Sequence, residues 1–176
     1  FELDSKNPET LIILSVSANI KQDLKQRVEL MKKALEINPN HASANFEYGL
    51  SVTSFGEFEK AKEYMLKSVE LNPISINDTY TNVSLMFCDM GLRDFENALD
   101  HINKAIEIDP DFTGGLGFKA SILAHLDRVE EAKDFLAKYQ EKRPAVKKTS
   151  DYEKVAPTII KEVLIEGLVK AGMPNE

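Results

Sequence analysis

The sequence is poor in the residues that several fold classes depend on. It has 176 residues, with no tryptophan, one cysteine, 8 glycines and 7 prolines. The single cysteine, Cys88, cannot form an intramolecular disulfide, which fits a reducing compartment. The low glycine and proline content and the 43% of hydrophobic residues exclude a disordered or collagen-like chain. We therefore expect a folded, cytoplasmic protein.

Excess positive charge and long apolar runs are also missing. The net charge of -7 disfavours nucleic acid as the main ligand, because phosphate binding requires a basic surface. The longest apolar run, residues 11–14, is far too short to span a bilayer, so we expect no membrane partner. The chain starts at Phe1 without the pattern of a signal peptide. We interpret it as a fragment of a longer protein.

Prolines mark an internal repeat. Pro39, Pro73, Pro110 and Pro144 are separated by 34, 37 and 34 residues, and they end the similar segments ALEINP, SVELNP, AIEIDP and YQEKRP. A period of 34 residues accommodates two helices and two turns, and the apolar residues recur with helical spacing. The sequence therefore predicts an all-α chain of helical hairpins. The predicted units are residues 8–41, 42–76, 77–112 and 113–144, with residues 1–7 as the tail of a preceding repeat.

Small residues recur where the two helices of each hairpin would face each other, and they let the backbones approach closely. They are Ser15, Gly49, Ser84 and Ala120 in the first helices, and Ala61, Ala98 and Ala132 in the second. Ser84 and Ala98 are two residues further apart than the other pairs, so we expect two extra residues in the turn of the third hairpin and one more between repeats. In the first hairpin Arg27 takes the small position, which predicts that this hairpin is bent or loosened.

The combined pattern resembles the tetratricopeptide repeat over about residues 8–144. The residues that carry the resemblance are Gly49, Gly56, Phe58, Ala61, Ser68 and Pro73. It implies a right-handed α-solenoid of about four hairpins and a non-enzymatic module that binds proteins. Gln22 and Asp127 stand where Gly56 occupies the turn of the second unit, and both depart from the family pattern.

The C-terminal part has a different character. Residues 145–156 are polar and are predicted to form a linker, and residues 157–171 are predicted to form a helix that caps the open end of the array. The tail around Glu166, Gly167 and Gly172 also resembles the ending of bacterial multidomain regulators, in which a tetratricopeptide array follows a nucleotide-cyclase or DNA-binding domain. This resemblance implies an alternative function as a regulatory, sensory or dimerising arm. A homodimer formed through the last helix is a further hypothesis.

Stacked hairpins of this kind curve, and their first helices line the concave face. We expect the partner to bind there, as a peptide or protein segment with apolar anchors and basic flanks. The alternative is that several of these side chains pack against neighbouring first helices. The predicted groove residues are Ile12, Val16, Phe46, Glu47, Leu50, Asp78, Asn82, Leu85, Asp89, Phe118 and Ser121, with Glu9 and Cys88 on the same face.

The sequence predicts no catalytic, cofactor or metal site. His41, His101 and His125 lack the spacing of metal ligands. Cys88 has no histidine close in sequence and is expected to act as a small apolar residue. Capture of chaperone C-termini, a known property of one subclass of the family, is not expected either. The positions that hold basic residues in that subclass include Glu47 and Asp78, which carry the opposite charge.

Overall fold

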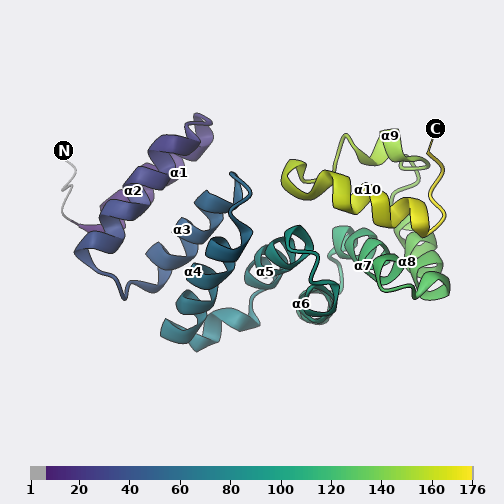
Figure 1. The fold of residues 1–176 in the computed structure, drawn as a ribbon, viewed down its shortest axis with the longest axis horizontal. Coiled ribbons are helices and arrows are strands. Elements are labelled where there is room, and N and C mark those ends of the chain that lie inside the picture. Colours follow the sequence, from purple (N-terminus) through teal and green to yellow (C-terminus); the bar gives the residue numbers. More distant parts are fainter. Residues whose placement is uncertain (1–6, 176) are drawn as a thin grey trace. The chain divides into compact units, whose positions relative to one another are not determined.

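The computed structural model describes residues 7–175, and in this range the chain is helical without any strand. Tertiary contacts divide the chain into two compact units, with the boundary between Ile76 and Asn77. No helix within the described range is long and apolar enough to cross a bilayer. The elements are labelled in Figure 1. They are α1 (Pro8–Ile20), α2 (Leu24–Ile37), α3 (Ala42–Thr53), α4 (Phe58–Leu71), η1 (Pro73–Asn77), α5 (Thr79–Gly91), α6 (Phe95–Ile108), α7 (Thr113–His125), α8 (Val129–Lys142), α9 (Thr149–Tyr152), η2 (Thr158–Ile160) and α10 (Lys161–Lys170).

Unit 1 consists of two helical hairpins. The helices α1 and α2 form one pair, α3 and α4 form the other, and α3 also packs on α2. Gly49 is required at the centre of the second pair, because a methyl group there would lie 2.8 Å from the Ala61 backbone oxygen and from Met65 Cγ. Such overlaps force shifts in a packed interior. The small residues that the sequence places between paired helices, Ser15, Gly49 and Ala61 in this unit, are buried.

Each hairpin turn contains one residue in the left-handed conformation. The φ angles are +58° at Gln22, +75° at Gly56, +57° at Arg93 and +58° at Asp127. The same backbone hydrogen bond closes each turn. In the second hairpin, for example, the N–H of Glu57, just after Gly56, donates to the carbonyl of Val52, four residues before Gly56. Only glycine adopts this conformation without steric cost. The turn is therefore the same in all four hairpins, although only one of them has glycine at this position.

Unit 2 contains the hairpins α5–α6 and α7–α8, and α7 packs on α6. The turn of the third hairpin has the same length as that of the second, with Asp94 N–H donating to the Asp89 carbonyl at 2.8 Å. The three additional residues of the 37-residue interval therefore all lie before α5, where η1 (Pro73–Asn77) is inserted. The expected two-residue extension of the third turn is wrong. As a consequence Met86, and not Ser84, is the equivalent of Gly49 in α5.

The remaining elements lie on α7 and α5 within unit 2. Helix α10 packs on α7, η2 contacts α5, and the short helix α9 contacts α10 (Figure 1). The backbone N–H of Thr149 donates to the Pro174 carbonyl at 2.9 Å, which fixes the tail beside α9. Residues 145–156, expected as a linker, thus include a helical turn, and the predicted last helix starts with η2 and continues as α10.

The expected all-α array of helical hairpins is confirmed in the described range. The second helices end at Ile37, Leu71, Ile108 and Lys142, each two residues before one of the four repeat prolines. Proline restricts the residue before it to extended backbone, and this terminates the preceding helix. The predicted tail of a preceding repeat lies almost entirely outside the described residues.

Candidate functional site

The two first helices of unit 1, α1 and α3, expose apolar side chains at matching positions. Ile12 and Phe46 occupy equivalent positions 34 residues apart, and so do Val16 and Leu50. All four side chains reach the solvent, and Val16 is 49% exposed. Because α1 and α3 are neighbours with the same relation to their second helices, these residues point the same way. We call Ile12, Val16, Phe46, Glu47 and Leu50 the first-helix face of unit 1.

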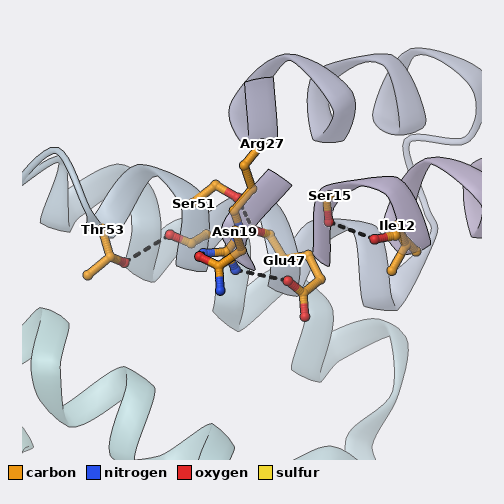
Figure 2. A network of polar contacts seen from close by, with 8 residues as sticks. Ile12, Ser15, Asn19, Arg27, Glu47, Ser51 and Thr53 are labelled. Carbon is orange, nitrogen blue, oxygen red and sulfur yellow. Dashed lines mark hydrogen bonds and ion pairs between the residues drawn. The ribbon is translucent and has the colours of Figure 1, made fainter. Parts of the chain in front are cut away.

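Arg27 adds a charged group to this face. Its guanidinium donates to Glu47 Oε2 at 3.0 Å and to Asn19 Oδ1 at 3.3 Å, and so joins α2 to α3 and α1 (Figure 2). Arg27 is 9% exposed and stands where the other hairpins carry Ala61, Ala98 and Ala132. The first hairpin is nevertheless paired like the others, with helices of 13 and 14 residues. The expectation of a bent or loosened hairpin is not met, because the long side chain leaves the helix interface.

The sequence interpretation missed two parts of this surface. Arg27 was identified only as a misfit in the repeat, and nothing in the spacing shows which way its side chain runs. The second part is Ile13 and Ile20 of α1, which are 64% and 77% exposed and form an apolar stripe with the predicted residue Val16. The spacing of three and four residues puts them on one side of the helix. This apolar stripe extends the first-helix face of unit 1 along α1.

In unit 2 the structure corrects the predicted positions on α5. Asp78 caps the helix and accepts from the Thr81 N–H at 3.0 Å. Asn82, Leu85 and Asp89 are all 0% exposed. These four residues were assigned to the concave face on a register that is shifted by two residues. With the insertion placed at η1, the equivalents of Phe46 and Leu50 on α5 are Val83 and Phe87.

Hydrogen bonds confirm the corrected register of α5. Asn82 donates from Nδ2 to the Asp78 carbonyl at 2.9 Å, and Asn45 makes the same bond to the His41 carbonyl in α3. Each asparagine thus lies at the start of a first helix and 37 residues from its counterpart. Asp89 turns toward the second helix of its own hairpin, where its Oδ2 lies 2.7 Å from His101 Nδ1. It therefore belongs to the interior of the hairpin.

On α7 the two predicted residues are buried, and the C-terminal helix covers one of them, Ser121. Phe118 is 7% exposed and Ser121 is 0% exposed. The Phe118 ring meets Phe87 of α5 edge to face, with ring centroids 5.5 Å apart. The Ser121 hydroxyl donates to the Leu164 carbonyl of α10 at 3.1 Å. Val83 and Phe87 of α5, with Gly117 and Ser121 of α7, make up the first-helix face of unit 2, and α10 lies over its α7 part.

His125, at the end of α7, also contacts α10. Its Nε2 lies 2.9 Å from the Val163 carbonyl, and its ring stacks on Phe95 with centroids 4.2 Å apart. Burial lowers the pKa of His125 below its ordinary value. The bond to the Val163 carbonyl and the charge of Glu166 partly offset this effect, whereas Lys170 and Arg93 add to it. The packing around α10 thus favours the neutral imidazole.

The three histidines and Cys88 lie in separate environments. His41 caps α3, His101 pairs with Asp89, His125 contacts α10, and Cys88 is buried. Among residues 7–175, no three His, Cys, Asp or Glu side chains gather in a way that could hold a metal ion. A cavity of about 280 Å³ lies between α2, α3 and α4 and is lined by residues that include Tyr48, Tyr64 and Lys67.

Comparison with known proteins supports the geometry. MamA from Desulfovibrio magneticus RS-1 superposes with a TM-score of 0.69 at 20% identity, over 77% of this chain and 75% of that one. YrrB, described as a tetratricopeptide-repeat protein with an unusual peptide-binding site, gives a TM-score of 0.70 at 18% identity, over 96% and 86%. An O-GlcNAc transferase from Thermobaculum terrenum gives 0.66 at 15% identity, over 80% of this chain and 26% of that one. At these identities the likeness shows the fold alone.

No curated protein sequence matches the chain. The tetratricopeptide repeat family model matches residues 8–41, 42–75 and 88–112, which together make up more than half of the chain. The fourth hairpin, α7–α8, lies outside the matched segments, although its turn and its small interface residues Ala120 and Ala132 follow the same pattern. The chain belongs to the tetratricopeptide repeat family.

Proposed function

We propose that this chain is a non-enzymatic interaction module whose first-helix face in unit 1 binds a peptide segment of a partner protein. The observation that carries this proposal is the row of partly exposed apolar side chains at equivalent positions, Ile12 and Phe46, then Val16 and Leu50. Solvated helix surfaces are normally polar, so repeated apolar residues on one face favour a binding surface. The family relation supports a protein or peptide as the partner.

The charges beside this row favour basic residues in the partner. Glu9 is 67% exposed on its side chain and lies 3.0 Å from His41, and Glu47 is 24% exposed and shared with Arg27. A lysine or arginine flanking the apolar anchors would meet the open side of these carboxylates. The net charge of -7 would also speed the approach of a basic segment. A cytoplasmic setting, where the buried thiol of Cys88 stays reduced, is part of the proposal.

A peptide selection followed by binding measurements tests this function. Random 16-residue peptides displayed on phage would be selected on the purified chain, and enriched sequences would be measured by fluorescence anisotropy. We expect enrichment of Leu, Ile or Phe beside Lys or Arg. The double variant Phe46→Ser with Leu50→Ser should lose about 2–3 kcal/mol of binding free energy, because central apolar anchors carry most of the affinity.

Leu66→Ser serves as the matched control. Leu66 is 39% exposed and apolar, but it lies on the second helix α4. Its replacement should leave the affinity of the selected peptides unchanged. Binding that survives the Phe46 and Leu50 replacements, or that is lost equally in the Leu66 variant, would refute the assignment of the first-helix face.

A further inference from the structure

The C-terminal helix α10 does not pack where the first helix of a following repeat would pack. Within each unit, a first helix that follows a hairpin packs on the preceding second helix, as α3 does on α2 and α7 does on α6. Helix α10 follows α8, but it packs on the first helix α7, and η2 just before it contacts α5 (Figure 1). It therefore lies on the surface that first helices present to ligands in stacked hairpins.

The contact between α10 and α7 depends on small residues on both sides. Gly167 of α10 lies so close to α7 that a methyl group there would overlap Ser121 Oγ and come within 2.5 Å of the Ser121 backbone oxygen. Ser121 is the equivalent of Leu50, which is large and partly exposed in unit 1. Gly117, the equivalent of Phe46, is also small, and it leaves room for the Tyr152 hydroxyl. Gly167 on α10 and Ser121 on α7 let the two helix backbones approach closely, whereas Gly117 makes room for Tyr152 of α9.

The polar contacts recognise the backbone of α10 more than its side chains. The Ser121 hydroxyl and the His125 imidazole donate to the carbonyls of Leu164 and Val163, at 3.1 and 2.9 Å. An ion pair to an α10 side chain joins Arg93 to Glu166 at 2.9 Å, and the two side chains are 56% and 41% exposed. Any amphipathic helix with glycine at the crossing and a carboxylate one residue before it would meet the same groups.

The connection between α8 and α10 contains little regular structure. Between the end of α8 and the start of α10, residues 143–160 contain only the four-residue helix α9 and the three-residue turn η2, and three of the side chains that anchor them are Val146, Tyr152 and Ile160, each at most 6% exposed. The tail is held by Thr149, whose hydroxyl donates to the Asn175 carbonyl at 2.6 Å. Leu164 and Leu168 supply the buried apolar side of α10, both at 0% exposure. These are the properties of a tethered helical ligand.

We propose that the first-helix face of unit 2 is a binding site for an amphipathic helix of a partner protein, and that α10 occupies this site as an internal competitor. The partner helix carries leucines three residues before and one residue after a glycine, and a carboxylate next to that glycine to face Arg93. The inference rests on the proposed function of first-helix faces, but it concerns α7 instead of α1 and α3. When α10 docks, the site is closed to the partner.

A synthetic peptide of residues 157–175 provides the probe, added in solution to the full chain. Gly167→Leu in the chain should displace its own α10, and the labelled wild-type peptide should then bind at least about tenfold more tightly than to the unaltered chain. The apparent affinity of a site is reduced by the fraction of time that it is occupied by its competitor. Glu162→Leu is the matched control, because it adds the same side chain at an exposed position of α10 and should leave peptide binding weak.

Two results would overturn the proposal. One is a folded Gly167→Leu chain that does not bind the peptide; the other is a peptide carrying Gly167→Leu that binds as well as the wild-type peptide. A dimer of the unaltered chain in sedimentation, with α10 exchanged, would assign the surface to a second copy and overturn the assignment to a partner. None of these results depends on Phe46 or Leu50, so the proposal fails or holds apart from the proposed function.

If the Gly167→Leu chain does not fold, hydrogen exchange on the unaltered chain tests whether α10 opens independently of the hairpins. A competitor that leaves and returns opens independently of the hairpins, so amides of α10 should exchange at least about tenfold faster than those at the centre of α7. Exchange of α10 and α7 at the same rate would show that α10 is an inseparable part of unit 2, and the proposal would be wrong.

Discussion

Replacing His101 by phenylalanine tests the corrected register of α5 through the buried polar pair of Asp89 and His101. Asp89 is 0% exposed and the His101 side chain 13%, with 2.7 Å between Asp89 Oδ2 and His101 Nδ1. In the neighbouring hairpins the equivalent pairs are apolar: Ala18 with Leu30, Val52 with Tyr64, and Leu123 with Phe135. The third hairpin therefore contains a polar pair at a position that elsewhere is filled by apolar contact.

The magnitude follows from what the replacement leaves behind. His101→Phe removes a hydrogen bond to a buried carboxylate, and bonds to charged groups contribute about 1.5–3 kcal/mol. Removing one member of a buried polar pair costs more than the bond itself, because the remaining group stays buried and loses this partner. We expect a loss of about 3 kcal/mol of unfolding free energy. Adding Asp89→Leu to His101→Phe reproduces the pair of the fourth hairpin and should restore stability to within about 1 kcal/mol, as apolar replacements of buried ion pairs do.

Urea unfolding followed by circular dichroism measures these differences, and hydrogen exchange of α5 and α6 amides assigns them to unit 2. Asp100→Leu, at an exposed position of α6, controls for a gain in apolarity on that helix. If Asp89 faced solvent on a groove, as the repeat pattern predicts, His101→Phe would cost less than about 0.5 kcal/mol of unfolding free energy. That result, or a double variant as unstable as the single one, would refute the register.

Three further outcomes are expected. Gln22 has φ +58°, so Gln22→Gly should raise the unfolding free energy by about 0.5–1 kcal/mol, whereas Lys21→Gly, at φ −79°, should lower it by a similar amount in thermal unfolding. Arg27→Ala should change stability by less than about 1 kcal/mol, but Glu47→Ala should cost about 2–3 kcal/mol, because it leaves a buried guanidinium with fewer partners. The lowered pKa of His125 means that the docked state of α10 prefers the neutral ring. Docking should therefore be full above pH 6.5 and weaken as the pH falls below it, seen as faster amide exchange in α10, and His125→Gln should remove this dependence.

The repeat could be predicted because several independent features of the sequence indicate it. The prolines give the period, the small residues give the interface of each hairpin, and the apolar spacing gives the helices. On α1, α3 and α7 these signals agree, and the groove positions Ile12, Val16, Phe46 and Leu50 lie where the pattern puts them. Whether a partner binds there stays a prediction.

The register of α5 could not be predicted because the interval of 37 residues has two local solutions. An extension of the turn puts Ser84 at the helix interface, and an insertion before the helix puts Met86 there. Ser84 matches the preference for small residues, and the interpretation followed it. Met86 is 0% exposed, and its long, flexible side chain fills an interface that glycine or alanine fills elsewhere. The position of the left-handed turn residue distinguishes the two solutions. In the third hairpin this residue is Arg93 and not glycine, so the sequence does not show where the turn lies.

The place of α10 could not be read from its own sequence either. Its apolar side fits the end of the array and the face of α7 equally well, so an end cap was the natural expectation. The tail residues that resemble those of multidomain regulators also have structural roles here: Gly167 makes the close approach to α7, Glu166 pairs with Arg93, and Gly172 adopts φ +97° just after α10. The packing on α7 accounts for these residues by itself, and the resemblance to regulators stays a prediction.

Two residues of α7 nevertheless indicate that other elements of the chain pack closely on this helix. At the two positions that point out from the first helices, α3 has Phe46 and Leu50, α5 has Val83 and Phe87, and α7 has Gly117 and Ser121. Large apolar residues at these positions suit a peptide whose side chains reach into the surface. Ser121 lies where Gly167 of α10 makes its close approach, and Gly117 lies against Tyr139 of α8 and Tyr152 of α9. The change from large to small residues at these two positions of α7 therefore makes room for the chain's own C-terminal elements.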